Sequence, residues 1–339
     1  MPELKTLPRI TIAHVAERAG VSIATVSRVI NGTGPVTEET AAQVRTAITE
    51  LKYVPYAAAR SLASKKTNML GLLLPEVGSD FMSPLLHGIE IAARENDFGL
   101  LISTESRSST PFHRPLGEHN TDGLLIFTNS LNEAELTHLY ERRFPLVLLH
   151  QSPPTGLNIP CITFENKSGA RKLVDHLIET HSYRGIAFLR GPEDNEDSSW
   201  RELGYREALE AHHLPFDPAL VATGGFSAAG ARAPVMSWLN DGVAIEAIFA
   251  GDDATASGVI SVLREAGKRV PEDIAVVGFD DLPTSRYLTP PLTTIHAPIE
   301  QAGYEAARQL GQLIRYRQAE SLVLLPTELV IRRSCGCTG

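Results

Sequence analysis

Residues 11–32 read TIAHVAERAGVSIATVSRVING, and this stretch decides the architecture of the N-terminal part of the chain. Thr11 can cap a helix whose apolar residues follow at helical spacing, and Gly20 permits the left-handed backbone of a sharp turn. Ser22 can cap a second helix over 23–30. Two short helices joined by a turn of about three to four residues that contains Gly form a helix-turn-helix.

A third helix is expected from Thr37 to about residue 51, with an apolar face that closes a small core against the first two. In the second helix the apolar residues should face inward and the small polar residues outward. A short helix that exposes small hydroxyl side chains and Arg28 fits the major groove of DNA, where bulky acids would meet the phosphates. The pattern therefore favours a DNA-binding head over the alternative, a three-helix bundle without DNA contacts.

Charge is unevenly distributed along the 339 residues, whose formal net charge is −9. Residues 1–66 hold nine Lys or Arg against five acids, a net of +4, whereas the remainder holds 22 basic and 35 acidic residues, a net of −13. A basic end on an acidic body confines the attraction to DNA phosphates to that end.

A resemblance to a known family becomes specific at the same end. Residues 11–16, 19–22, 24–32, 51–55 and 57–63 closely resemble the DNA-binding head and hinge of the lac repressor family (LacI/GalR-type). The resemblance implies a sequence-specific transcription regulator, a repressor, that binds double-stranded operator DNA. Because two-fold heads need two-fold sites, it also implies a palindromic operator and a homodimer, with a tetramer as the larger alternative.

The resemblance assigns DNA contacts to single residues. Ile23, Ala24 and Arg28 occupy base-reading positions, where Arg28 can bond guanine in bidentate fashion and the other two can contact a thymine methyl. The contacts to the DNA backbone fall on small polar residues, namely Thr11, Ser22, Thr25, Ser27 and Asn31. Each of these five can also be read as a helix cap.

Residues 55–66 are expected to form a hinge. Pro55 ends the preceding element, and the Ala-rich stretch over 57–63 is too short to persist as a helix alone in water, so it should fold on DNA. By the resemblance, Ala59 and Leu62 contact the minor groove at the operator centre, where an apolar wedge kinks the duplex. The alternative for Leu62 is an ordinary core position.

From residue 67 onward apolar runs alternate with amphipathic stretches. The expected strands are 70–74, 100–104, 123–127 and 146–150 in a first series, and 186–189, 247–250 and 274–278 in a second. The expected helices are 85–94, 169–179, 201–211 and 255–267. Alternation of this kind predicts parallel doubly wound sheets, and two series predict two lobes with a ligand cleft at the carboxyl ends of the strands.

The body carries the resemblance as well, through residues 247–253, 270–281, 291–295 and 332–335. It is similar to periplasmic sugar-binding proteins, which implies three chain crossings between the lobes and a return helix over about 299–316. The implied effector contacts are Asp80, Phe81, His150, Asn195, Arg201, Phe226, Asp253 and Phe279. Acids and Arg bond hydroxyls and an aromatic face packs on a sugar ring, so a small sugar or sugar derivative is the expected effector.

Two of these residues have plain alternatives, because Arg201 can be a solvated surface residue and His150 an ordinary strand end. Two segments also depart from the family pattern. Residues 105–121 should carry a helix but include two prolines, so a loop or a truncated helix is expected. The pair at 165–166 is Glu-Asn where Asp-Asn is expected.

We therefore predict an N-terminal all-α helix-turn-helix head at 9–54, a hinge helix and linker at 55–66, and an α/β two-lobed periplasmic-binding-protein-like body at 67–339 with two doubly wound parallel sheets. The first lobe would comprise about 67–163 and 297–320. The second would comprise about 164–296 and 321–337.

Cys161, Cys335 and Cys337 are too few for a disulfide scaffold. The last two lie near the C-terminus without a second ligand pair nearby in the sequence, which favours a frayed tail with reduced thiols over a metal or redox site. No metal and no cofactor are expected. No apolar stretch approaches a membrane span, and residues 1–9 lack the apolar part of a secretory signal, so no membrane partner and a cytoplasmic location are expected.

Other functions compete with this interpretation. An enzyme is disfavoured because residues 225–230 miss the nucleophile-elbow spacing by one residue, and a cleft-binding role explains the acid pairs 252–253 and 280–281 more simply. A transport binding protein would need an export signal. Within regulation, a purine or a partner protein could replace the sugar, although Asn195 stands where the family's purine sensors would be expected to place an Arg.

Overall fold

The computed structural model describes residues 10–53, 66–104 and 116–338, and the chain divides into two compact units, Met1–Thr67 and Asn68–Gly339. The predicted minor-groove residues Ala59 and Leu62 lie outside the described residues.

The first unit consists of α1 (Ile12–Ala19), α2 (Ile23–Asn31) and α3 (Glu38–Glu50). Gly20 ends α1 in the left-handed region at φ 65° and ψ 30°, so the chain turns sharply into α2. The core of this unit is small and apolar, and its buried members are Val15, Ala16, Val26, Val44 and Ala47. The expected helix-turn-helix and its third helix are confirmed.

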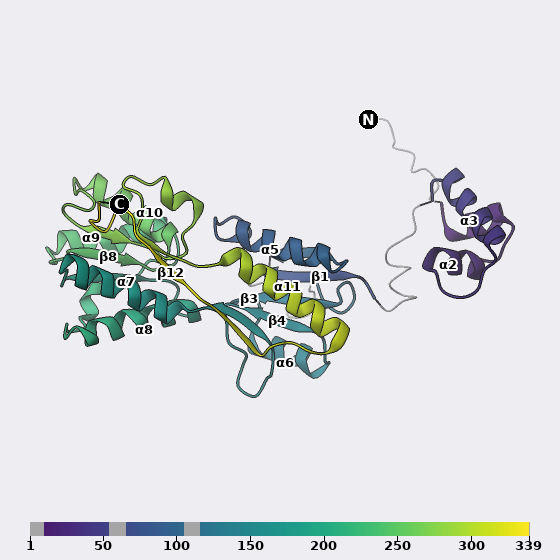
Figure 1. Ribbon diagram of the computed structural model, residues 1–339, viewed down its shortest axis with the longest axis horizontal. Coiled ribbons are helices and arrows are strands. Elements are labelled where there is room, and N and C mark those ends of the chain that lie inside the picture. The colour runs from purple at the N-terminus through teal and green to yellow at the C-terminus, as the bar shows by residue number, and fades with distance from the viewer. Residues whose placement is uncertain (1–9, 54–65, 105–115, 339) are drawn as a thin grey trace. The chain divides into compact units, whose positions relative to one another are not determined.

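The second unit contains two lobes, each built on a parallel sheet (Figure 1). The first sheet has six strands in the order β11-β5-β4-β3-β1-β2. Their bounds are β1 (Met69–Leu74), β2 (Gly99–Thr104), β3 (Gly123–Phe127), β4 (Leu146–Leu149), β5 (Cys161–Phe164) and β11 (Leu322–Leu325). Burial of all five residues of β3 explains why this segment reads as a continuous apolar run.

The helices of the first lobe are α5 (Met82–Glu95), α6 (Glu133–Glu141) and α11 (Ile299–Tyr316). Two of them, α5 and α11, lie side by side (Figure 1). Their backbones approach closely, because a Cβ on Gly88 would lie 1.9 Å from the carbonyl oxygen of Glu300, and one on Gly303 would lie 2.2 Å from that of Leu85. The return helix thus rejoins the first lobe, as the resemblance implied.

The sheet of the second lobe has four parallel strands in the order β7-β6-β8-β9. These are β6 (Ile186–Arg190), β7 (Val221–Thr223), β8 (Ala247–Ala250) and β9 (Ala275–Val277), and the helices are α7 (Asn166–His181), α8 (Glu196–Ala211), α9 (Arg232–Asn240) and α10 (Asp253–Glu265). Short 3-10 turns occupy Pro218–Leu220, Ala229–Ala231 and Pro283–Arg286. An antiparallel pair, β10 (Thr294–His296) with β12 (Glu328–Val330), completes the set.

One lobe boundary differs from the expectation. Residues 321–337 were assigned to the second lobe, but Leu322–Leu325 forms β11 and pairs in parallel with β5 of the first sheet. After α11 the chain lies beside the first sheet, where β11 pairs with β5. Without β11, β5 would be an edge strand with unpaired backbone N–H and C=O groups. The chain crosses to the second lobe only before β12 (Figure 1).

Helix bounds and the shortened segment also differ in detail. Helix α8 begins at Glu196, five positions before the expected start, so Arg201 lies inside the helix. In the segment predicted as a loop or truncated helix, residues 105–115 lie outside the described residues. Residues 116–120 form bends and turns, and residue 121 has no regular structure. None of the helices in the described ranges combines the length and apolarity needed to cross a membrane.

The C-terminal tail is not frayed, contrary to the expectation. Ser334 and Cys335 are fully buried. Ser334 holds the tail to the second lobe, since its Oγ accepts from the backbone N–H of Thr293 at 2.8 Å and its carbonyl accepts from that of Val276 at 2.9 Å. The sequence contains no sign of this docking, because the partners are distant in the chain.

Candidate functional site

The head presents the three predicted base-reading residues on the exposed side of α2. Ile23 is 51% exposed although it is a large apolar residue, and Ala24 and Arg28 are exposed too. Val26, between them in sequence, is fully buried. Burial of an apolar face orients this helix, and exposure of its other face leaves those three side chains free to reach a partner.

The predicted backbone-contact residues act partly as helix caps. Ser22 Oγ accepts from the backbone N–H of Thr25 at 3.1 Å, and Thr11 is the N-cap residue of α1. Asn31 donates its side-chain amide to Ser27 Oγ at 3.1 Å. Capping satisfies the first N–H groups of a helix, so Ser22 and Thr11 hold cap positions, and their contacts with DNA stay a prediction.

The body contains a cleft of about 530 Å³ between the two lobes. Six of the eight predicted effector residues line it, namely Asp80, Phe81, His150, Asn195, Arg201 and Phe226. They follow the carboxyl ends of strands in both sheets, which is where parallel α/β sheets bind ligands. Residues far apart in the chain therefore meet on one surface.

Arg201 is a cleft residue and not a solvated surface residue, because it is only 3% exposed. Its Nε donates to Asn166 Oδ1 at 2.9 Å, one terminal nitrogen to the carbonyl of Gly251 at 2.6 Å, and the other to Asp280 Oδ1 at 3.1 Å. The guanidinium also lies 3.8 Å from the ring centroid of Phe279. These bonds use three of its five N–H donors and hold the group in one orientation.

His150 is buried at the end of β4, with φ at +59°. Its Nδ1 lies 3.0 Å from Asp197 Oδ2, while Nε2 has no hydrogen-bond partner among the described residues. Burial by itself would raise the pKa of Asp197, but the neighbouring His150 and Arg201 outweigh it and hold that pKa below its ordinary value. The ionised carboxylate therefore orients the ring and leaves Nε2 for a ligand.

Asp253 and Phe279 do not line the cleft, contrary to the expectation. Asp253 accepts hydrogen bonds from the hydroxyl of Thr294 at 2.6 Å and the backbone N–H of Leu282 at 2.8 Å, so its carboxyl is already satisfied. Burial raises its pKa to about 7. Phe279 is fully buried behind the Arg201 guanidinium. Both residues support the cleft from the interior.

The acids that reach the cleft in their place are Asp252 and Asp280, together with Asp197. Burial raises the pKa of Asp252, and it raises that of Asp280 well above the ordinary value despite the neighbouring Arg201. The acid pairs at the strand ends are visible in the sequence, but the sequence does not show which member of each pair faces the cleft. Asp197 carried no sequence signal, because the expected helix began at residue 201 and only the structure places Asp197 in the first turn of α8.

Aromatic side chains supply apolar surface on both sides of the cleft. The Phe81 ring meets that of His150 edge-on at 5.5 Å between centroids. Phe226 has φ at +54° and packs against Gly191, where an added Cβ would lie 2.3 Å from the ring. Asn195 uses Oδ1 to cap α8 by accepting from the backbone N–H of Ser198 at 2.9 Å, which leaves its amide nitrogen as the group for a ligand.

Comparisons with known proteins cover nearly the whole chain. Residues 11–56 match the profile of "Bacterial regulatory proteins, lacI family", and residues 174–335 match that of "Periplasmic binding protein-like domain". The HTH-type transcriptional regulator CelR of Thermobifida fusca is 34% identical, with 96% of this chain and 98% of that protein aligned. The HTH-type transcriptional repressor PurR of Aliivibrio fischeri (strain MJ11) is also 34% identical, over 96% and 97%.

Solved structures agree with the fold. The lac repressor dimer bound to operator and the anti-inducer ONPF has a TM-score of 0.82 at 28% identity, covering 96% of this chain and 99% of that one. A complex of a transcriptional regulator CelR with cellobiose has a TM-score of 0.71 at 32% identity, covering 96% and 100%. With a matching head, a matching body and relatives aligned along almost their full length, the chain belongs to the lacI family of bacterial regulatory proteins.

Proposed function

We propose that the chain is a repressor that binds a palindromic operator as a homodimer and that a small neutral sugar in the cleft controls it. The observation that carries the ligand class is the chemistry of the cleft wall. His150 has a buried Nε2 without a partner among the described residues, and Arg201 retains two N–H donors. A polyol offers hydroxyls that can satisfy both.

The charge of the lining favours a neutral ligand. Carboxyl groups dominate the wall, with Glu76, Asp80, Asp194, Asp197, Asp252 and Asp280 against the single guanidinium of Arg201. A hydroxyl donates and accepts, so it can pair with a carboxyl in either protonation state. A phosphate group would instead meet several carboxylates in a partly enclosed site, which costs binding free energy.

The related proteins support a sugar as the ligand and suggest one alternative class of ligand. The CelR–cellobiose complex supports a sugar, whereas the similarity to PurR makes a purine the first alternative to test. The role of the cleft is binding without turnover, in line with a family of DNA-binding regulators. A regulator of this kind acts in the bacterial cytoplasm, where its operator is.

The output of the protein is DNA binding by the head. Ile23, Ala24 and Arg28 read base edges in the major groove, and Thr11, Ser22, Thr25, Ser27 and Asn31 contact phosphates. Ala59 and Leu62 of the hinge enter the minor groove. Because the cleft is formed by both lobes, a ligand can change the angle between them, and a coupling of about 1–3 kcal/mol to the operator is expected.

The test is a thermal-shift screen of the full chain with neutral sugars, the matching sugar phosphates and purine bases, followed by operator titrations with each ligand that binds. We expect a neutral sugar to raise Tm, with about 2.7 kcal/mol of stabilisation at 100 times its Kd, and to change operator affinity. A chain that responds only to sugar phosphates or purines would refute the proposed ligand class. Recovery of a chemically altered sugar would refute binding without turnover.

A further inference from the structure

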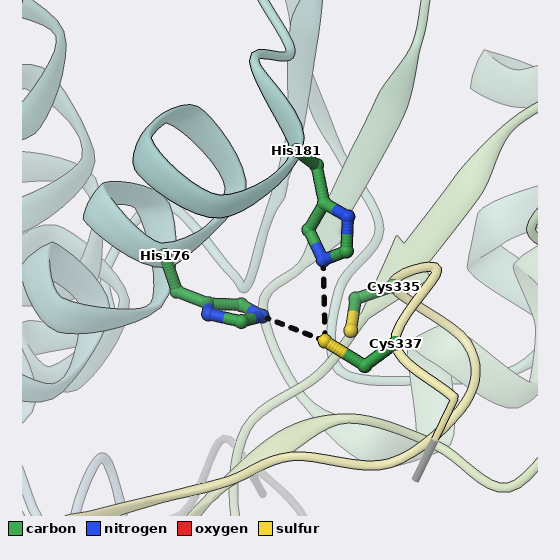
Figure 2. A group of neighbouring side chains, drawn as sticks. All are labelled: His176, His181, Cys335 and Cys337. Carbon is green, nitrogen blue, oxygen red and sulfur yellow. Dashed lines mark hydrogen bonds between the residues drawn. The ribbon is translucent and has the colours of Figure 1, made fainter.

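Four side chains that can bind metal converge at the C-terminal end of α7 (Figure 2). His176 and His181 come from the last turns of α7, and Cys335 and Cys337 come from the C-terminal tail. Their four ligand atoms, two imidazole nitrogens and two sulfurs, all lie within 4.8 Å of one another. More than 150 positions separate the two pairs in sequence.

The distances match those of a tetrahedral metal site. Cys337 Sγ lies 3.4 Å from His181 Nε2 and 3.7 Å from His176 Nε2 (Figure 2). Around a zinc ion, with Zn–S about 2.3 Å and Zn–N about 2.0–2.1 Å, neighbouring ligand atoms are about 3.3–3.8 Å apart. The widest separation in the group exceeds this range by at most about 1 Å, which rotation of the half-buried His181 and Cys337 side chains can close.

Surrounding groups hold these side chains in place. Thr180 Oγ1 lies 3.1 Å from His176 Nδ1, and a partner on Nδ1 leaves Nε2 as the ligand atom. Tyr183 stacks on His181 at 5.3 Å between ring centroids and donates its hydroxyl to the carbonyl of Cys335 at 3.2 Å. In metal sites of proteins, the residues that bind the metal are commonly oriented by hydrogen bonds from neighbouring groups.

Gly336 lets the two cysteines face the same point. It has φ at +107°, a region that favours glycine, and an added Cβ would lie 3.2 Å from the His181 ring and from the Tyr183 hydroxyl oxygen. The buried Ser334 and Cys335 anchor the tail on the near side of this glycine. The second cysteine is therefore placed by a docked backbone and not by a free end.

The donor set selects the class of metal. Two thiolates and two imidazoles are soft or borderline ligands, which suit zinc and not magnesium or calcium. Four protein ligands close a tetrahedral site, and closed sites are structural. A site that joins the tail to α7 would stabilise the second lobe, which also has an apolar core that contains none of the four ligands.

We propose that His176, His181, Cys335 and Cys337 bind one zinc ion and that this ion ties the C-terminal tail to α7. This inference is independent of the ligand in the cleft. Asn166, which bonds Arg201, lies at the other end of α7, about 15 Å along the helix from His176 and about 22 Å from His181 at 1.5 Å per residue. Loss of the ion should therefore lower Tm without removing the response to an effector.

The experiment measures zinc in the full, reduced chain by mass spectrometry after equilibration with equimolar zinc and removal of loosely bound metal. We expect about one zinc per chain and a Tm that falls when a chelator removes it. Cys337→Ser, at a half-buried position near the chain end, should weaken zinc binding by more than about 100-fold, because loss of a group that only hydrogen-bonds a ligand already costs about 10–100-fold. Thr180→Val, which removes the hydroxyl beside His176 Nδ1, should weaken zinc binding by about 10–100-fold.

Two matched controls separate the site from general thiol or imidazole binding. Cys161→Ala removes a cysteine buried in β5, and His213→Asn removes an exposed histidine after α8. Both should retain one zinc per chain. Cobalt in place of zinc should produce the absorption of a tetrahedral thiolate complex in the wild type and not in Cys337→Ser.

Three results would overturn the proposal. The first is a reduced wild-type chain that takes up no zinc at equimolar concentration. The second is equal zinc binding by the wild type and Cys337→Ser. The third is a Cys335–Cys337 disulfide that forms in zinc-containing reducing buffer, found by titration of one free thiol in place of three.

Discussion

The head and the cleft differ in how their functional side chains are held: those of the head are exposed on one helix, and those of the cleft are buried and bonded to several elements. In the head, Ile23, Ala24 and Arg28 sit on one short helix and are exposed, so each can be changed without unpairing a buried neighbour. In the cleft, Arg201 alone bonds Asn166, Gly251 and Asp280, which come from other elements. Contacts in the head should be separable, whereas contacts in the cleft should be shared.

The largest effect is expected from Arg201→Ala. Removal of one partner of a buried ion pair costs about 3–5 kcal/mol, because the other partner and the polar groups around it are left unsatisfied. The variant should unfold at lower urea concentration and lose the effector response while the separate head still binds operator. Operator titrations with and without the effector, together with urea unfolding, measure both effects.

Arg232→Ala is the matched control, since this Arg pairs with Glu265 on the surface of the same lobe. Its cost should stay below about 1 kcal/mol. If the Arg201→Ala protein kept its response to the effector, the effector response would not depend on the hydrogen bonds that Arg201 makes to several elements of the cleft.

A pH-dependent effect is expected from Asp253→Asn. The pKa of Asp253 is raised to about 7 by burial, so the folded protein binds this proton more tightly than the unfolded chain does. The contribution of this group to the free energy of unfolding therefore falls as pH rises from about 4 to about 7, by about 4 kcal/mol in total. The Asn variant should lack this fall, so its free energy of unfolding, measured in urea, should rise relative to that of the wild type between about pH 4 and about pH 7.

Asp273→Asn should change the pH dependence of stability in the opposite direction. Hydrogen bonds from Arg269 lower the pKa of Asp273, so the stability it contributes is present at neutral pH and is lost in acid. If both variants followed the wild type at every pH, the two carboxyls would not differ between the interior and the surface in the way that their contacts indicate.

A smaller and more local effect is expected from Arg28→Ala. Loss of a bidentate base contact should cost about 1–3 kcal/mol of operator affinity and relax the preference at one base pair, with the stability of the head unchanged. Titrations against operators that differ at each base pair measure this. Arg45→Ala, which removes an exposed Arg of α3 paired with Glu38, is the control and should leave base preference intact. An equal loss on every sequence would show that Arg28 contacts only phosphates.

Prediction from the sequence was most successful where structure depends on neighbours along the chain. The spacing of Val15, Ala16 and Val26 with a Gly between their helices was enough to predict the head. Alternation of apolar runs and amphipathic stretches was enough to predict two parallel α/β lobes. The side on which Leu322–Leu325 pairs was not predictable, because an apolar strand of four residues fits the edge of either sheet.

The sequence by itself determined that this chain has a helix-turn-helix head and a two-lobed body, because helical and strand periodicities are local and repeat within a few residues. Only the tertiary structure decided which of two adjacent acids faces the cleft, why Arg201 is buried, and that the cysteines of the tail meet two histidines of α7. Those arrangements depend on contacts between distant segments, and burial in the folded chain sets the charge and partners of each side chain.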